Sequence, residues 1–247
     1  MAIKTMIHGA SGYMGRIMER LLGNDPAFEI VAKVSADGAA DCLQDINDYT
    51  GDLDMIIDFS HRSATKGLLD YAERRGAKLL LATTGQTPEE REMIKKAAEQ
   101  IPVFFSPTMS PAIAMLCKMV AEAARMFPDA DIELIEYHHN RKVDVPSGTA
   151  LMLANALLDA VEGSTLLIGR HENGKRKPRE IAVHSLRIGN KCGTHEVIIC
   201  TGTQTITFRH EAESRELFAE GAVVAAKYLA GKGAGLYTMH DLMKENA

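Results

Sequence analysis

The sequence has few features of a membrane-bound, secreted or nucleic-acid-binding protein. No run approaches the roughly 18 apolar residues of a membrane-spanning helix, and the N-terminus enters an apolar strand without a charged region followed by a leader. The four cysteines include no C-x-x-C pair, so we expect free thiols. The net charge is −5, whereas a duplex-binding surface is basic. We therefore expect a cytoplasmic protein with neither a nucleic-acid nor a membrane partner.

The chain does contain enough apolar sequence for one or two domains, because 46% of its 247 residues are hydrophobic. Strands and helices alternate in the first half, which predicts a doubly wound parallel sheet of the Rossmann type. The second half has successive strands joined by glycine-containing turns, which predicts an α+β domain with a largely antiparallel sheet. The predicted strands are 3–8, 29–34, 55–59, 78–82 and 103–105, then 132–137, 180–187, 194–200 and 204–210.

Two further assignments concern the surface and the core. Met115 and Met119 lie four residues apart on a predicted helix over 111–126, so we expect both in the core. The basic patch over 175–179 is flanked by glutamates and is expected at a solvated hairpin tip.

A glycine-rich turn follows the first predicted strand and precedes an apolar pattern of helical spacing at 16–22. Glycines let a backbone turn tightly and approach a pyrophosphate, which then lies at the helix N-terminus. The turn therefore predicts a dinucleotide site, and a tight turn without a ligand is the alternative. His8 is expected to pack. The expected cofactor contacts are Gly9, Ala10, Ser11, Gly12, Tyr13 and Met14.

The carboxyl ends of the other predicted strands supply further candidates, because ligands of such sheets bind at these ends. Asp37 follows the second strand, where an NAD-binding unit usually has an acid beside the ribose, and Ser35 is the alternative contact. No arginine follows to bind a 2′-phosphate, and Ser35 tolerates a phosphate better than a carboxylate does. Either NADPH or NADH is therefore expected. The remaining cofactor candidates are Ala82, Thr83, Thr84, Ser106, Thr108 and Met109.

The densest set of reactive side chains lies between residues 133 and 150. A predicted strand delivers two histidines, and Pro146 to Thr149 then precede an apolar run, as at a helix N-terminus. Such a terminus offers unpaired N–H groups and a partial positive charge to an anion. Imidazoles, an ammonium group and a helix N-terminus around one volume predict a small dianionic substrate and proton transfer near neutral pH. The charged and imidazole groups are His138, His139, Arg141, Lys142 and Asp144.

The spacing within this stretch predicts a bend. If the chain stayed extended, His138 and Lys142 would lie roughly 13 Å apart at about 3.3 Å per residue. One small ligand could not easily meet both, so we expect residues 140–146 to curl and close a cationic pocket. A metal hydrolase is a weaker alternative, because adjacent histidines lack the helical i, i+4 spacing of a zinc motif. We expect no metal.

The same stretch resembles the signature of the dihydrodipicolinate reductases, also called 4-hydroxy-tetrahydrodipicolinate reductases. That signature reads Glu-x-His-His-x-x-Lys-x-Asp-x-Pro-Ser-Gly-Thr, and every fixed position matches from Glu136 through Thr149. The resemblance covers essentially the whole chain. It includes Thr83-Thr84-Gly85, and its poorest match near the cofactor is Thr108-Met109, where relatives commonly have Asn-Phe.

The resemblance implies NAD(P)H-dependent reduction of 4-hydroxy-tetrahydrodipicolinate to tetrahydrodipicolinate, in lysine and diaminopimelate biosynthesis, by a cytoplasmic homotetramer. It implies a dinucleotide-binding domain at 1–109, completed by 214–247, and a substrate-binding and oligomerisation domain at 110–213. By matching positions, His138 is the proton donor or acceptor and Lys142 the second proton donor. Arg215 is a further carboxylate contact or a structural ion pair. The implied contacts with the small dicarboxylate substrate are His139, Ser147, Gly148 and Thr149.

Two rival functions share part of this pattern. Another two-domain NAD(P)-dependent dehydrogenase would have the glycine turn but would not need the His-His-x-x-Lys array. A non-catalytic dinucleotide sensor would bind the cofactor without oxidising it. Within the array, we expect Glu136 and Asp144 to position Lys142 and the imidazoles.

Overall fold

The computed structural model describes residues 1–106 and 108–245, and the remaining three positions lie outside this description. The chain divides into two compact units, one of residues 1–110 with 216–247 and one of residues 111–215. The last two positions of the expected segment 214–247 are among those not described. Each unit has its own sheet and its own apolar core.

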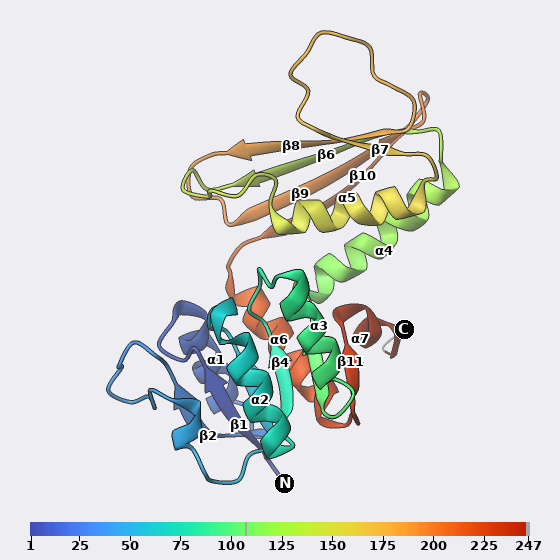
Figure 1. Ribbon diagram of the computed structural model, residues 1–247. Coiled ribbons are helices and arrows are strands. Elements are labelled where there is room, and N and C mark those ends of the chain that lie inside the picture. The colour runs from blue at the N-terminus through green and yellow to red at the C-terminus, as the bar shows by residue number, and fades with distance from the viewer. Residues whose placement is uncertain (107, 246–247) are drawn as a thin grey trace. The chain divides into compact units, whose positions relative to one another are not determined.

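The first unit contains a six-stranded parallel sheet in the order β11-β5-β4-β3-β1-β2 (Figure 1). The predicted Rossmann-type fold is thereby confirmed. Helices cover both faces of the sheet, so its inner strands are short runs of buried, mostly apolar residues: all four residues of β3 and three of the four of β4 are buried. The strands are β1 (Ile3–His8), β2 (Phe28–Val34), β3 (Met55–Asp58), β4 (Lys78–Leu81), β5 (Pro102–Phe105) and β11 (Gly235–Tyr237).

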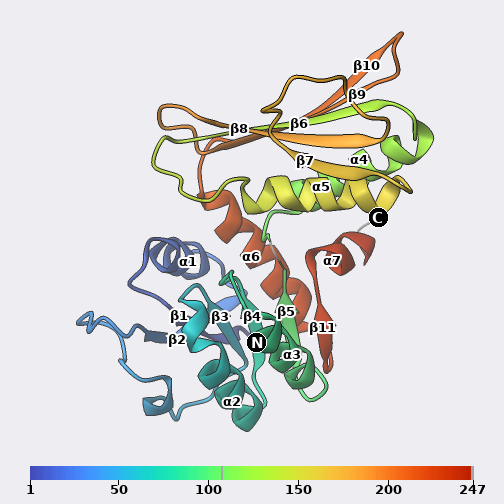
Figure 2. The same ribbon diagram turned by 45° about the horizontal axis from the view of Figure 1, so that its top comes forward.

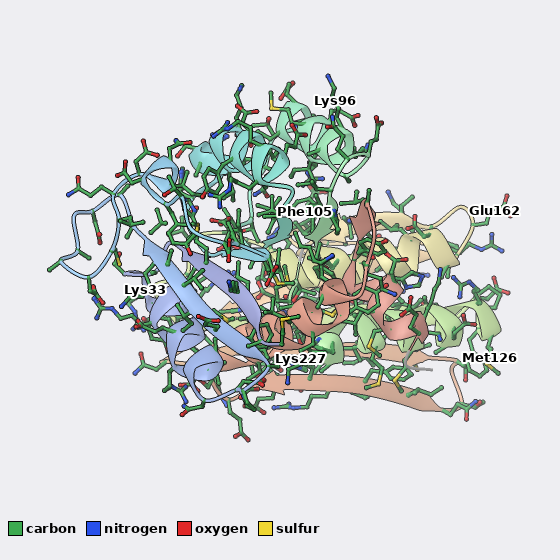
Figure 3. The ribbon with its side chains drawn as sticks, turned by 90° about the horizontal axis from the view of Figure 1, so that it is seen from below. Lys33, Lys96, Phe105, Met126, Glu162 and Lys227 are labelled. Carbon is green, nitrogen blue, oxygen red and sulfur yellow. The ribbon has the colours of Figure 1, made fainter. Side chains whose placement is uncertain are left out.

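Helices α2 and α3 pack on one face of this sheet, and α1 and α6 on the other (Figures 1 and 2). Between the sheet and helices α2 and α3 lies an apolar cluster of buried residues. Phe105, which is labelled in Figure 3, is partly buried and packs against this cluster. Thr87 caps α3 in a capping box: its Oγ1 accepts from the Glu90 N–H at 3.2 Å, and the Glu90 carboxylate accepts from the Thr87 N–H at 2.7 Å. The helical segments are α1 (Tyr13–Gly23), η1 (Ile46–Asp48), η2 (Arg62–Ala64), α2 (Thr65–Arg75), α3 (Pro88–Ala97), α6 (Glu216–Ala230) and α7 (Met239–Glu245).

The second unit contains a five-stranded sheet in the order β10-β9-β6-β8-β7, with α4 and α5 along one face (Figure 1). The central strand β6 is antiparallel to β9 and parallel to β8, and β7, which the sequence pattern did not predict, adds a parallel edge. The elements are α4 (Pro111–Met126), β6 (Asp131–His138), α5 (Gly148–Ala160), β7 (Thr165–Ile168), β8 (Glu180–Arg187), β9 (Gly193–Cys200) and β10 (Thr205–Ala212).

Alternation along β6 decides which side chains face the helices. Ile132, Leu134, Glu136 and His138 are buried, whereas the residues between them are not fully buried. Because successive strand residues point to opposite faces, one face carries both apolar core residues and two ionisable groups. The core therefore ends in a polar layer at the carboxyl end of β6.

Two predictions about side-chain placement were wrong. Met115 and Met119 are 47% and 44% exposed, because α4 turns a different stripe, including Ile113, Leu116 and Val120, inward. Arg176 is not at a solvated tip: its side chain is only 18% exposed and forms ion pairs with Asp131 and Glu133 of β6. The loop that carries it joins two parallel strands, so it is not a hairpin.

No helix within the described residues is both long and apolar enough to cross a membrane. The four cysteines are free, as expected from their spacing.

Candidate active site

The glycine turn between β1 and α1 forms a cradle of backbone N–H groups. The Gly9 and Ala10 N–H groups donate to the Val34 carbonyl at 2.9 and 3.1 Å, and Gly9 has a φ of +81°. Helix α1 begins at Tyr13, and its N-cap residue Gly12 provides no side-chain cap. The first-turn N–H groups of α1 therefore lack the side-chain acceptor that a serine or aspartate would supply, which suits an anion such as a pyrophosphate.

The close approach within this turn explains the need for glycine. A Cβ on Gly15 would lie 2.2 Å from the Gly9 carbonyl oxygen and 2.6 Å from the Ala10 Cα. A Cβ on Gly9 would lie 2.7 Å from the backbone of Phe59. The atoms that each added Cβ would meet belong to the backbone, so neither substitution can be accommodated by moving a side chain.

We expect Gly15→Ala to weaken binding of reduced nicotinamide dinucleotide at least tenfold, because the added methyl group forces the turn open. Isothermal titration calorimetry would measure the dissociation constant. Gly23→Ala is the matched control, because it lies on the same helix and a Cβ there has no heavy atom within 4 Å. Equal affinity in the two variants would remove the turn from the cofactor site.

Asp37 lies where an acid was expected, beyond the end of β2. Ser11 Oγ donates to Asp37 Oδ2 at 2.6 Å and lies 2.5 Å from Ser35 Oγ. Hydrogen bonds from the Ser11 hydroxyl and the Ala39 N–H lower the pKa of Asp37. The nearby cation Lys33, labelled in Figure 3, is already paired with Glu19 and Asp41. The end of β2 thus presents an ionised carboxylate and two hydroxyl groups.

The other cofactor candidates follow β4 and β5, whose carboxyl ends lie at the same edge of the sheet. Thr83 is buried, and its Oγ1 has no hydrogen-bond partner among the described residues. Its carbonyl accepts from Gln86 Nε2 at 2.9 Å. A buried hydroxyl group without a partner is one that a ligand can satisfy. Ala82 is half-buried and Thr84 exposed, whereas Ser106, Thr108 and Met109 are buried.

In the second unit, Glu136 is the centre of a buried polar cluster. Its side chain has 0% exposure; Oε1 accepts from Arg187 Nη2 at 2.9 Å and from the Ser147 N–H at 3.4 Å, and Oε2 forms an ion pair with His138 Nδ1. Burial alone would raise the pKa of Glu136, but hydrogen bonds, including those from His138 and Arg187, outweigh it and lower the pKa to about 2. Glu136 is therefore a carboxylate at neutral pH.

This carboxylate fixes the orientation of the His138 ring. Because Nδ1 contacts the Glu136 carboxylate, the proton on that nitrogen is retained. Nε2 is then the ring nitrogen that is available for proton exchange. A Cβ on Gly193 would lie 3.0 Å from His138 Nε2, so glycine at this position leaves space beside the reactive nitrogen.

The chain bends directly after β6, as the spacing predicted. The Lys142 N–H donates to the His139 carbonyl at 3.1 Å, which closes a turn. Lys142 Nζ forms an ion pair with Asp144 Oδ1 at 2.8 Å, and its side chain is 19% exposed. Burial and then the positive charge of Arg141 lower the pKa of His139. The turn thus presents a neutral imidazole and an ammonium group.

Ser147 is the N-cap of α5. Its Oγ accepts from the Ala150 N–H at 3.2 Å. Gly148 is exposed and Thr149 is half-buried at the first two helical positions. Their N–H groups precede the first hydrogen bonds of the helix, so they are free to bind a carboxylate.

Glu136, His138 and His195 are close enough to suggest a metal site, since one potential ligand atom from each lies within 4.8 Å of the others. However, Glu136 Oε2 and His138 Nδ1 are in direct contact, closer than two ligands of one ion can lie. The carboxylate also already binds Arg187. These contacts describe a network of ion pairs around the Glu136 carboxylate.

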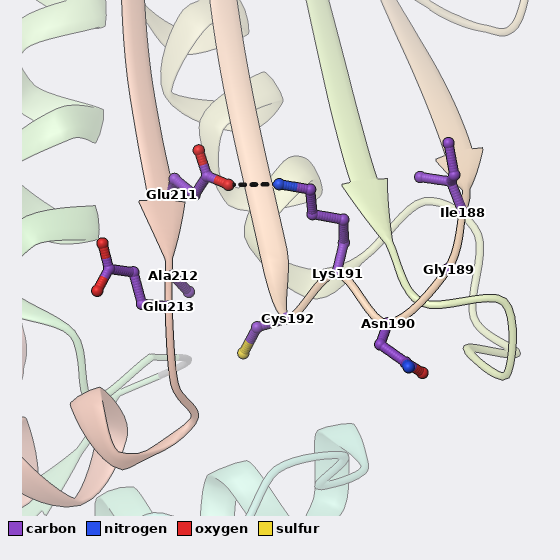
Figure 4. Close-up of a pocket in the computed structure, with 8 residues that line it drawn as sticks. All are labelled: Ile188, Gly189, Asn190, Lys191, Cys192, Glu211, Ala212 and Glu213. Carbon is purple, nitrogen blue, oxygen red and sulfur yellow. Dashed lines mark hydrogen bonds and ion pairs between the residues drawn. The ribbon is translucent and has the colours of Figure 1, made fainter.

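An open hollow of about 490 Å³ lies where the turn between β8 and β9 meets the end of β10 (Figure 4). Lys191 and Glu211 form an ion pair at 2.7 Å across it. On its rim, the Gly189 carbonyl accepts a hydrogen bond from the Asn140 N–H at 3.1 Å. The turn between β8 and β9 therefore supports the turn that carries Lys142. It contains neither proposed proton donor.

Comparison with known protein families identifies the family of this chain. The model of the dihydrodipicolinate reductase N-terminus matches residues 3–109, and that of the C-terminus matches residues 112–243. The chain belongs to the dihydrodipicolinate reductase family. The 4-hydroxy-tetrahydrodipicolinate reductase of Caldanaerobacter subterraneus subsp. tengcongensis is 40% identical over 99% of this chain and 100% of its own length. That of Clostridium novyi is 37% identical over 98% of each chain.

Solved structures agree with the fold of this family. The dipicolinate-bound dihydrodipicolinate reductase from Paenisporosarcina sp. TG-14 has a TM-score of 0.78 at 22% identity, over 96% of this chain and 98% of that one. The DAP dehydrogenase of C. glutamicum, in complex with DAP, has a TM-score of 0.58 at 14% identity, over 97% and 93%. At these identities the structural likeness shows the architecture that the reductase shares with other dehydrogenases.

Sequence reasoning missed two members of the buried cluster. Arg187 and His195 were given no role from the sequence, although they contact Glu136 and Ser147 respectively. The i, i+2 spacing of Glu136 and His138 on one strand was a signal that both share a face. No local spacing signals the partners, because they come from β8 and β9. His8, expected to pack, donates to or accepts from Asp58 at 2.8 Å.

Proposed function

We propose that this protein reduces 4-hydroxy-tetrahydrodipicolinate to tetrahydrodipicolinate, with His138 and Lys142 as the proton-transferring groups. Membership of the family makes the chain an NAD(P)H-dependent oxidoreductase of lysine and diaminopimelate biosynthesis. The observation that supports the residue assignment is the clustering of His138, Glu136 and Ser147 at the joint between β6 and α5.

The dinucleotide would be held by the glycine turn, the Ser11, Ser35 and Asp37 group, and the loops after β4 and β5. The reduced nicotinamide supplies the hydride. The orphaned Thr83 hydroxyl and the uncapped start of α1 fit such a ligand, because one needs a polar partner and the other an anion. We assign this role to the unit of residues 1–110 and 216–247, in line with the expected domain 1–109 completed by 214–247.

The substrate would be held by the second unit. Its two carboxylates suit the N–H groups of Gly148 and Thr149, the His139 imidazole and the Lys142 ammonium group. Replacing a C4 hydroxyl group by hydride releases water and consumes one proton. His138, with Nδ1 fixed by Glu136, can take a ring proton at Nε2 as the hydroxyl group leaves and return it after hydride addition. Lys142, as the second proton donor, can supply the one proton that leaves with the hydroxyl group as water.

Assembly and location are part of the same proposal. The sheet of the second unit is covered by helices on one face, and the family resemblance implies that the chain forms a homotetramer through this unit. Four free cysteines suit a reducing cytoplasm.

The decisive experiment follows the absorbance of the reduced nicotinamide while the intermediate is generated in situ. We expect oxidation of both NADH and NADPH, with the two values of kcat/KM within about tenfold, or about 1.4 kcal/mol. The Asp37 carboxylate favours the ribose diol of NADH, but it is exposed, so solvent screens its repulsion of a phosphate. The hydroxyl groups of Ser11 and Ser35 can bind the 2′-phosphate of NADPH.

Each rival predicts a different result in this assay. A dinucleotide sensor would bind both cofactors and oxidise neither. Another dehydrogenase would oxidise the cofactor only with members of an amino-acid or keto-acid panel. A strict preference for one cofactor would leave the reaction intact but contradict the role given to Ser35 and Asp37.

A further inference from the structure

His195 is a buried imidazole that the proposed reaction does not use. It lies on β9 with 4% exposure, and its Nε2 is 3.1 Å from Ser147 Oγ. Its ring meets the His138 ring edge to face, with centroids 5.3 Å apart and planes at 73°. One side chain therefore contacts both the proposed proton donor and the N-cap of α5.

The hydrogen-bond inventory determines the direction of the contact with Ser147. Ser147 Oγ accepts from the Ala150 N–H, and its own proton needs an acceptor. Among the described residues, His195 Nε2 is the acceptor within reach. The serine therefore donates to Nε2, and the imidazole carries its proton on Nδ1, which is buried and has no hydrogen-bond partner among the residues that the structure describes.

A neutral imidazole fits the surroundings of His195. Burial and then the charge of His138 lower the pKa of His195 to about 3, and the Glu136 carboxylate opposes this only in part. His210 of β10 lies directly opposite His195, and Lys142 adds another positive charge. Protonation at Nε2 would also set a donor against the donating serine and leave the hydroxyl group unpaired.

We propose that His195 is a positioning residue that joins the proton donor to the anion-binding turn. Its Nε2 fixes the Ser147 hydroxyl group at the start of α5, and its ring edge holds the His138 imidazole against Glu136. The start of α5 and His138 then keep a fixed position relative to each other. When a substrate carboxylate binds at Gly148 and Thr149, the substrate ring lies next to His138 Nε2. This inference rests on the proposed function.

The test compares His195→Phe, which keeps a flat ring but removes the acceptor, with His195→Gln, which restores an acceptor oxygen. We expect His195→Phe to raise the KM for the dicarboxylate substrate about tenfold and to lower kcat about tenfold, because an angstrom-scale shift of a reacting group has effects of this order or larger. The acidic limb of the profile of kcat/KM against pH is expected to move, since His138 loses a neighbour. His195→Gln is expected to recover most of the KM change and little of the kcat change.

A matched control and a double-mutant cycle separate positioning from general damage. His210→Asn replaces the histidine directly opposite His195 on β10, which has no role in the proposed reaction, and is expected to change KM and kcat less than about twofold. If His195 acts through the serine, the effects of His195→Phe and Ser147→Ala on KM will not add. The dissociation constant for NADH is expected to stay unchanged in all variants.

The outcomes distinguish this inference from the proposed function. If His195→Phe and His195→Gln both keep the KM and the pH profile of the parent, or if the cycle is additive, the inference is overturned while the function stands. If the parent fails to oxidise cofactor with the intermediate, the proposed function fails first. Should His195→Phe unfold, His195→Gln and the cycle with Ser147→Ala carry the decision.

Discussion

Lys142→Ala is expected to lower kcat at least about 100-fold, the usual effect of losing an acid–base group. Lys142 is held after the turn at His139 by its ion pair with Asp144, so its ammonium group is oriented before any ligand arrives. The alanine variant loses both the charge that attracts a carboxylate and the proton that can be donated. Steady-state rates with saturating substrate would measure the loss.

Two variants give this experiment its resolution. Lys142→Arg keeps the charge but cannot donate a proton at neutral pH, so kcat is expected to fall as in the alanine variant while KM changes less. Lys191→Ala removes another lysine of the same unit, which is 53% exposed and paired with Glu211, and is expected to leave kcat within about twofold. Near-normal turnover in Lys142→Ala would exclude the lysine from the mechanism.

Glu136→Gln is expected to lower the free energy of unfolding at pH 7 by on the order of 3 kcal/mol, because it breaks the ion pair between the fully buried Glu136 and the half-buried Arg187. Activity is expected to fall as well, since the His138 ring loses the group that holds Nδ1. Urea denaturation at pH 7 would measure the stability. Glu211→Gln is the control: the pKa of its carboxyl is also lowered to about 2, but by exposed partners that solvent screens, so little loss of stability is expected.

The same pair predicts how the difference depends on pH. The pKa of Glu136 is about 2 in the folded protein and near the ordinary value of 4.5 in the unfolded chain. A depressed folded pKa contributes stability that is present above the unfolded pKa and is lost as pH falls through the folded one. The advantage of the parent over Glu136→Gln is therefore expected to be full at pH 6 and to shrink from about pH 4.5 toward pH 2. A difference that stays constant over this range would show that folding does not lower the pKa of the Glu136 carboxyl group.

Much of the fold follows from local patterns. Strand and helix alternation predicted the parallel sheet, because this pattern depends on neighbours in sequence. The glycine turn was predictable for the same reason, since the close contact of Gly15 with Gly9 lies within one turn. The bend before Lys142 followed from the requirement that one ligand reach two groups.

The parts that could not be predicted depend on contacts between distant segments. Arg187 and His195 reach the cluster from β8 and β9, whose register with β6 is set by the packing of a whole sheet. Met115 and Met119 were assigned to the core because α4 is apolar on more than one stripe, and only the partner helix decides which stripe is buried. Arg176 was assigned to solvent because its acidic partners are more than 40 residues away.

The pairing of β11 with β5 has a consequence for synthesis. The sheet of the first unit includes Gly235–Tyr237 beside Pro102–Phe105, and α6 covers one of its faces, so this unit is complete only after residues 111–215 have been translated. The unit of residues 111–215 is continuous and leaves the ribosome earlier. Since domains fold as units during translation, the inserted segment can complete its core while the segment that began first still lacks a strand and its covering helix.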